Sequence, residues 1–273
     1  MLHSIEMLER TNIIATMSRP ILVHGSDMHY HYCKYHRAGG QAYRLYKEYL
    51  IARFVSIWEF YSSPVNLLKV RPEDIPVDLG IPRKSFEYPC FALQEVRLAN
   101  ELDKQSITLL TESGRTDELR DEFLKCCFFD IWTANEDRSH NNYNLLLVQE
   151  NKHSCLFPID HEACFNHGEL KQPLIPITYE ESLIYSEAFA RLFTTHNSAI
   201  SPARLATTRT FYYIYMQKCR EALAAIMASI PADWGIDVQK EATILARFLF
   251  DEQWFSTAWT TFLEYIGYYR DQI

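Results

Sequence analysis

Two short runs of strand-forming residues lie near the start of the chain. Residues 21–23 read Ile-Leu-Val and residues 29–35 read His-Tyr-His-Tyr-Cys-Lys-Tyr, with Gly25, Ser26 and Asp27 between them. β-Branched and aromatic residues on both sides of such a turn predict a β-hairpin. Apolar residues then recur every three or four positions from about residue 41 to residue 58, which predicts a helix.

The pattern changes twice along the rest of the chain. Prolines at 72, 76, 82 and 89 restrict residues 66–93 to short strands and loops. Residues 117–134 predict a helix that is apolar on most of its surface and therefore buried. A second hairpin is expected from strands at 143–148 and 155–159, and further helices are expected near 182–194, 203–229, 239–250 and 252–268.

This order of elements predicts an α+β protein with a small β-rich lobe followed by a large, mainly helical lobe. A chain of 273 residues is long enough for two lobes that share a cleft. We expect an N-lobe over residues 1–95 and a C-lobe over residues 96–273. Hydrophobic residues make up 48% of the sequence and charged residues 23%, which is typical of a folded globular protein.

Charge and cysteine content exclude several classes of protein. A formal net charge of −8 argues against direct nucleic-acid binding as the main task, since that work needs an excess of cations. Seven cysteines without CxxC spacing suit buried thiols in a reducing compartment. The first residues do not resemble a secretion signal, and the sequence has no run of 18 apolar residues, so we expect a cytoplasmic protein without a membrane partner.

Candidate chemistry is concentrated between the buried helix and the second hairpin. Asp137 and Asn142 lie five residues apart on one polar segment, and Asp160 follows the last strand of the hairpin. Phosphoryl transfer needs a carboxylate that orients the attacking hydroxyl and oxygen ligands that hold Mg²⁺ against the phosphates. These three residues supply both parts.

The same segment resembles a known family. Residues 137–146 read Asp-Arg-Ser-His-Asn-Asn-Tyr-Asn-Leu-Leu, and residues 159–161 read Ile-Asp-His, which is similar to the catalytic and metal-binding loops of HipA-like kinases and more distantly of phosphatidylinositol kinases. The resemblance implies a two-lobed protein-kinase-like fold that uses ATP and Mg²⁺. It also implies that Asp137 is catalytic, that Arg138 fixes the loop or Asp137, and that Asn142 and Asp160 are metal ligands.

The N-lobe contains candidates for nucleotide binding. A kinase needs a strand lysine that faces the phosphates and a helix glutamate that holds the lysine. Lys34 and Glu48 fit these roles and resemble the same region of HipA-like kinases. The sequence lacks an evident glycine-rich loop, so two candidates remain for the loop that covers the phosphates. One contains Gly25 and Ser26, and the other is formed by residues 37–40. Glu162 departs from the family pattern. Its carboxylate is either an extra ligand of the metal ion or a charge that repels the other carboxylates near the ion.

Several functions remain open at this stage. The resemblance implies a protein acceptor with serine or threonine hydroxyls, and a small antitoxin protein as a partner if the chain is the toxin of a toxin–antitoxin pair. A kinase for a small molecule or lipid is an alternative, and a nucleotide-binding pseudokinase is another. Four histidines near the polar segment allow a zinc interpretation, but they lack HExxH spacing: His140, His153, His161 and His167.

Overall fold

The computed structural model describes residues 1–16, 18–37, 42–112, 117–150, 153–168, 170, 172–194 and 200–271. The chain divides into two compact units, each built from several segments. The first unit holds Met1–Arg53, Ser63–Arg97 and Ile226–Val238, and the second holds Phe54–Ser62, Leu98–Ala225 and Gln239–Ile273. The expected boundary between lobes at residue 95 stays a prediction.

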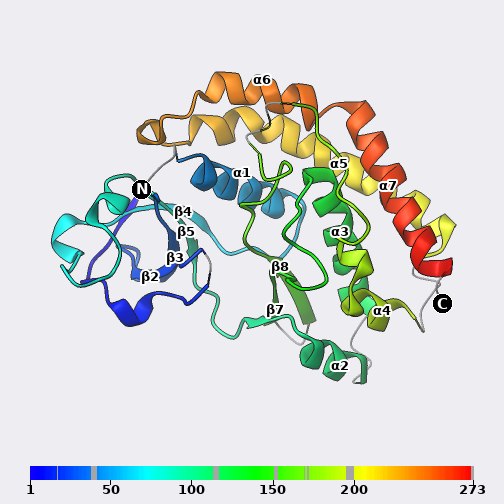
Figure 1. Ribbon diagram of the computed structural model, residues 1–273, viewed down its shortest axis with the longest axis horizontal. Helices are drawn as coiled ribbons and strands as arrows, with labels where there is room; N and C mark the ends of the chain where they lie inside the picture. Colours follow the sequence, from blue (N-terminus) through cyan, green and yellow to red (C-terminus); the bar gives the residue numbers. More distant parts are fainter. Residues whose placement is uncertain are drawn as a thin grey trace. The chain divides into compact units, whose positions relative to one another are not determined.

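A five-stranded sheet with strand order β1-β4-β5-β3-β2 forms the first unit's framework (Figure 1). Its strands are β1 (Leu2–His3), β2 (Ile21–His24), β3 (Tyr30–Lys34), β4 (Val65–Lys69) and β5 (Cys90–Gln94). β1 pairs with β4 in parallel, and the other neighbours are antiparallel. The predicted first hairpin is confirmed as β2 and β3, and the short strands predicted for residues 66–93 are confirmed as β4 and β5.

Successive side chains of β3 point alternately toward the core and away from it. Cys33 is fully buried and packs in a core with Ile21 of β2 and Ala92 of β5. Because successive side chains on a strand point to opposite faces, Lys34 points away from this core. The position of this lysine therefore follows directly from the burial of its neighbour.

The turn between β2 and β3 depends on a glycine. A Cβ atom at Gly25 would lie 2.8 Å from Asp27 Oδ1 and 3.0 Å from two atoms of the His31 ring. These two side chains form a hydrogen bond of 3.0 Å across the turn. Only glycine leaves the space for this contact.

Helix α1 (Tyr43–Ile57) is buried around most of its circumference. The predicted helix is confirmed, although its expected first residue, Gln41, lies outside the described residues. α1 starts in the first unit and ends in the second. The described residues of the first half of the chain also include the short 3₁₀ helices η1 (Arg10–Asn12), η2 (Pro72–Asp74) and η3 (Arg83–Phe86).

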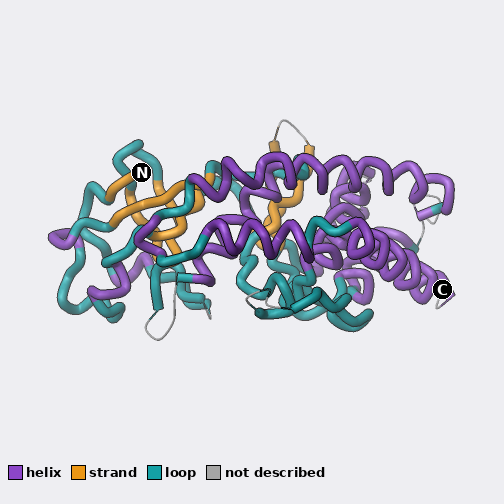
Figure 2. Tube along the Cα trace, turned by 90° about the horizontal axis from the view of Figure 1, so that it is seen from above, coloured by secondary structure: helices purple, strands orange, loops and turns teal. Residues whose placement is uncertain are grey.

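Most of the described trace of the second unit is helical, with one small sheet (Figure 2). The sheet has the order β6-β7-β8 and consists of β6 (Asn100–Glu101), β7 (Leu145–Glu150) and β8 (His153–Pro158). The predicted second hairpin is thus confirmed. The helices are α2 (Lys104–Glu112), α3 (Asp117–Thr133), α4 (Glu187–Phe193), α5 (Pro202–Ala228), α6 (Val238–Phe248) and α7 (Glu252–Asp271), with η4 (Leu183–Tyr185). The 3₁₀ helix η6 (Ala232–Trp234) and the last residues of α5 belong to the first unit.

Two details of the helical part differ from the sequence prediction. The helix expected at 182–194 is divided, because the Ser186 hydroxyl accepts a hydrogen bond from the Phe189 N–H at 3.1 Å and starts α4 there. α2 was not predicted. Its first turn is closed by Asp103 and Ser106, each of which accepts a hydrogen bond from the other's backbone N–H.

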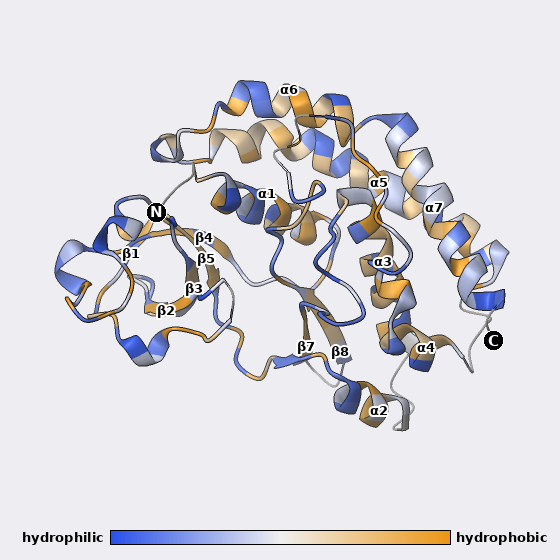
Figure 3. Cartoon of the chain, in the orientation of Figure 1, coloured by the Kyte–Doolittle hydropathy of each residue, from blue (hydrophilic) through white to orange (hydrophobic). Residues whose placement is uncertain are grey.

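Aromatic side chains fill the core of the second unit. Trp58 stacks on Trp132 with 5.3 Å between ring centroids, and Phe128 stacks on Tyr212 at 5.1 Å. Trp132 and Phe128 lie on α3, and their burial confirms the buried helix predicted for residues 117–134. In contrast, polar and apolar residues alternate around α6, which buries Leu245 (Figure 3). In the described part of the chain, no helix is long and apolar enough to cross a membrane.

Candidate active site

The candidate catalytic loop starts where α3 ends. Ala134 has a φ of 48°, in the left-handed region, and its N–H donates to the carbonyl of Ile131 at 3.3 Å. The Asn135 N–H donates to the Asp130 carbonyl at 2.9 Å. These two bonds form the Schellman ending of a helix, with alanine in the position usually taken by glycine. The chain reverses here, which brings the following loop back beside the last turn of α3.

Two amide side chains hold the Asp137 carboxylate. Its Oδ2 atom accepts a hydrogen bond from Asn144 Nδ2 at 2.7 Å and another from Asn142 Nδ2 at 3.2 Å. Asn142 is exposed, whereas Asp137 and Asn144 are half-buried. The loop thus brings the predicted catalytic aspartate together with the predicted metal ligand Asn142. Asn144 defines the orientation of the carboxylate.

Arg138 lies in a buried polar network next to this carboxylate. Its guanidinium forms an ion pair with Asp130 of α3, and both side chains have no exposed surface. Another nitrogen of the guanidinium donates to the carbonyl of Ile159 at 2.9 Å and lies 3.4 Å from His161 Nδ1. Arg138 therefore joins the loop to Asp130 and to the backbone after β8, and its expected role in the site stays a prediction.

The electrostatics of the buried pair are dominated by loss of water. Burial raises the pKa of Asp130 to about 6, although Arg138 and the Asn135 amide favour its charged form. Burial opposes the positive charge of Arg138 as well, but the Asp130 carboxylate outweighs it and the pKa of Arg138 is raised. Both groups are therefore costly to bury alone and depend on each other.

The backbone connects the catalytic loop to the loop after β8. The Ile159 N–H donates to the Asn144 carbonyl at 3.0 Å. Asn144 and Asp160 have φ values of 45° and 55°, a left-handed conformation that asparagine and aspartate tolerate better than most residues. Asn144, which accepts this hydrogen bond, and Asp160, which follows its donor, thus both have a left-handed backbone conformation.

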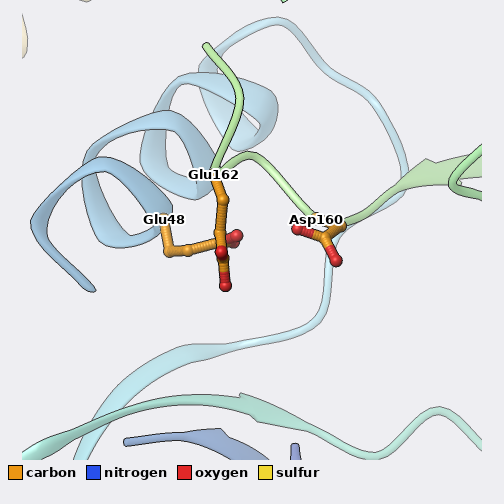
Figure 4. A group of neighbouring side chains, drawn as sticks. All are labelled: Glu48, Asp160 and Glu162. Atoms are coloured by element: carbon orange, nitrogen blue, oxygen red, sulfur yellow. The ribbon is translucent and has the colours of Figure 1, made fainter. Parts of the chain in front are cut away.

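The loop after β8 carries two carboxylates, Asp160 and Glu162 (Figure 4). One oxygen of each lies within 4.8 Å of an oxygen of the other, and both residues are half-buried. A hard cation such as Mg²⁺ prefers oxygen ligands, and these carboxylates are of that type. The expected roles of Asn142 and Asp160 as metal ligands stay predictions. No group of three potential ligands includes a histidine in the described ranges, which gives the zinc interpretation no support.

In the first unit, Lys34 and Glu48 meet. Glu48 extends from α1 (Figure 4), and its Oε1 atom accepts a hydrogen bond from Lys34 Nζ at 2.6 Å. The side chains are 12% and 1% exposed, so water screens this ion pair little. The predicted strand lysine and helix glutamate are thus partners, and their role toward a nucleotide stays a prediction.

The two loops considered for covering phosphates differ in what the structure describes. The Gly25 N–H donates to the His29 carbonyl, and the Ser26 N–H donates to the His3 carbonyl, each at 2.8 Å. Both N–H groups therefore donate hydrogen bonds to carbonyl groups of the protein itself. The Ser26 hydroxyl accepts a hydrogen bond from the His3 N–H at 3.3 Å. Cofactor binding by Gly25 and Ser26 stays a prediction. The alternative loop, residues 37–40, is described only at Arg37; Gly39 and Gly40 lie outside the described residues.

Asp130 is the site residue that the sequence analysis missed. It stands within an apolar run of α3, between Phe129 and Ile131, where a charge would be buried. A buried carboxylate needs a charged or hydrogen-bonding partner. This mismatch between residue and surroundings was a signal in the sequence, and Arg138 eight residues later was the available partner.

The fold and these loops define the class of protein first. A five-stranded N-terminal sheet followed by a mainly helical part, with a loop bearing aspartate and asparagine before a hairpin and an aspartate after it, is consistent with a two-lobed kinase-like fold.

The family follows from comparison with known proteins. A family model for HipA-like kinases matches residues 5–253, and the chain therefore belongs to the HipA-like kinase family. This membership supports a kinase function and agrees with the resemblance seen in the sequence. A comparison with curated proteins gave no match.

Proposed function

We propose that the chain transfers the γ-phosphoryl group of ATP, with Mg²⁺, to serine or threonine hydroxyls of a protein. The observation that carries this proposal is the Asp137 carboxylate held by two asparagine amides in a loop joined by hydrogen bonds to the loop that bears Asp160. An oriented carboxylate and nearby oxygen ligands are the parts that phosphoryl transfer requires.

Each residue has a task in this proposal. Asp137 accepts the proton of the acceptor hydroxyl, and the amide bond from Asn144 keeps its Oδ2 atom in place. Asn142 and Asp160 would hold Mg²⁺, with Glu162 as a further carboxylate. The ion supplies charge neutralisation at the phosphates. Lys34, held by Glu48, would contact the α- and β-phosphates.

The test is transfer from labelled ATP in the presence of Mg²⁺, to the chain itself or to proteins of a cell extract. Asp137→Ala and Asp160→Ala should abolish transfer, while Asp78→Ala, a change of an exposed aspartate in the first unit, should leave it unchanged. ATP binding without transfer in the wild type would favour the pseudokinase alternative. Transfer only to a small molecule would favour a small-molecule or lipid kinase.

The biological setting is a separate part of the proposal. The seven cysteines are free thiols, which suits the reducing cytoplasm. We place the activity there, as a growth-inhibiting toxin countered by a small antitoxin protein, on the basis of family membership. Induced expression should arrest growth of the host cell only when Asp137 is intact. Equal growth arrest by Asp137→Ala would remove the toxin role without removing the kinase.

A further inference from the structure

An exposed histidine of the catalytic loop lies next to a group of tyrosines. The His140 ring meets the Tyr185 ring edge-on, with 5.4 Å between centroids and 88° between planes. His140 Nδ1 lies 3.3 Å from the carbonyl oxygen of Glu180, which it reaches as a donor. The stretch that contains residues 179–185 is thereby fixed beside the loop that carries Asp137 and Asn142.

The tyrosines form one surface across this stretch and α7. Tyr179 meets Tyr185 at 5.3 Å, Tyr265 at 5.4 Å and Tyr268 at 5.7 Å between ring centroids. Tyr185 is 46% exposed and Tyr268 is 51% exposed, although both rings are large and apolar. An exposed aromatic group of this kind is typical of an interaction site.

Carboxylates surround these rings. Glu180 is exposed and follows Tyr179 in the sequence, and Glu264 is exposed one turn before Tyr268 on α7, so Glu264 shares a helix face with Tyr268. Burial, together with the nearby charges of Glu180 and Glu264, raises the pKa of the Tyr265 hydroxyl to about 12. We call the surface formed by His140, Tyr179, Glu180, Tyr185, Glu264 and Tyr268 the tyrosine surface.

We propose that the tyrosine surface docks a positively charged segment of the acceptor protein, and so selects hydroxyls flanked by arginine or lysine. Arginine and lysine bind to the faces of aromatic rings and pair with carboxylates, and the tyrosine surface offers both. A negatively charged acceptor would be repelled. This inference rests on the proposed kinase function and adds the acceptor class to it.

Sequence proximity connects the docked segment with the chemistry. His140 stands three residues after Asp137 and two before Asn142. A peptide held against Tyr185 and His140 therefore lies beside the candidate catalytic loop, where a hydroxyl on the same peptide can approach Asp137. Because docking and transfer use different side chains, the two can be tested separately.

Docking is measured first, without nucleotide. A fluorescein-labelled peptide with a serine between arginines is titrated with the full chain, and fluorescence anisotropy gives the dissociation constant. The same peptide with glutamates in place of arginines should show no binding. Glu264→Lys should weaken binding of the arginine peptide about tenfold, since one exposed attraction becomes a repulsion. Tyr268→Ala should weaken it about threefold.

A matched control separates this surface from the general negative charge of the chain. Glu221 is an exposed glutamate on α5, and Glu221→Lys changes the net charge by the same amount. It should leave the dissociation constant within about twofold of wild type. Equal binding of both peptides, or equal effects of the changes at 264 and 221, would overturn the inference.

Failure of the inference and failure of the proposed function give different results. If the arginine peptide binds and Glu264→Lys weakens it, but wild type transfers no phosphate, the docking surface stands and the kinase function fails. If wild type phosphorylates both peptides with equal KM, the kinase function stands and the tyrosine surface does not select the acceptor. Asp137→Ala should bind the peptide like wild type.

Discussion

Replacing Asp130 with asparagine tests whether the buried ion pair organises the catalytic loop. The change keeps the shape of the side chain but removes the charge that compensates Arg138, which has no exposed surface. The guanidinium would keep the Ile159 carbonyl and the contact with His161. Breaking a buried pair from one side costs about 3–5 kcal/mol. This is a large share of the roughly 5–15 kcal/mol that stabilises a typical domain.

The assay is unfolding in urea, monitored by tryptophan fluorescence. Trp132 and Trp254 report on the relevant unit, because the Trp254 indole N–H donates to the Trp132 carbonyl at 2.9 Å. The same α3 helix offers a matched control in Asp121, whose ion pair with Arg204 is exposed, at 56% and 49% of the two side chains. Asp121→Asn should cost no more than about 1 kcal/mol.

A second variant separates the loss of a partner from the value of the pair. Asp130→Leu combined with Arg138→Met removes both charges, and should cost less than Asp130→Asn alone, because no uncompensated charge remains buried. If Asp130→Asn were as mild as Asp121→Asn, or if the double variant cost the sum of its parts, the reasoning about mutual dependence would be refuted.

Two further predictions follow from the described contacts. Asn144→Gly keeps a positive φ accessible but removes the amide that holds Asp137. Because the lost charge-assisted hydrogen bond is worth about 1.5–3 kcal/mol, we expect kcat to fall at least about tenfold, with little change in folding. Steady-state kinetics measures kcat, and thermal unfolding measures the stability. Gly25→Ala should destabilise the fold by about 1–3 kcal/mol, because the added methyl group overpacks the turn. Gly267→Ala in α7, where an added Cβ would have nothing within 4 Å, should stabilise the fold by about 0.5–1 kcal/mol. Equal urea midpoints of the two variants would contradict both predictions.

Local pattern was sufficient for much of the fold. The strand-forming residues on both sides of Gly25, Ser26 and Asp27 predicted the hairpin of β2 and β3. The apolar run of α3 predicted a buried helix, and the polar segment after it contained Asp137 and Asn142. These features depend on neighbours in the sequence, which is why they could be predicted.

What could not be predicted depends on contacts between distant positions or on weak local signals. The parallel pairing of β1 with β4 joins residues near 2 and 68, and no turn connects them directly. α2 is rich in threonine and serine, which form helices poorly, and only the Asp103–Ser106 pair marks its start. The partner of Arg138 depends on the reversal at Ala134, an unusual conformation for alanine.

The shorter of the two contacts that Arg138 makes with the loop after β8 is to the Ile159 carbonyl, at 2.9 Å, and the other is to the His161 ring at 3.4 Å. Every amino acid has a backbone carbonyl, and every one except proline also keeps the N–H that donates to Asn144, so these backbone contacts do not depend on the side chain at position 159. Positions 130 and 138 have no such freedom and should change together during evolution. Relatives that have lost the acidic residue at 130 should also have lost the arginine, and many lineages with one but not the other would speak against this coupling.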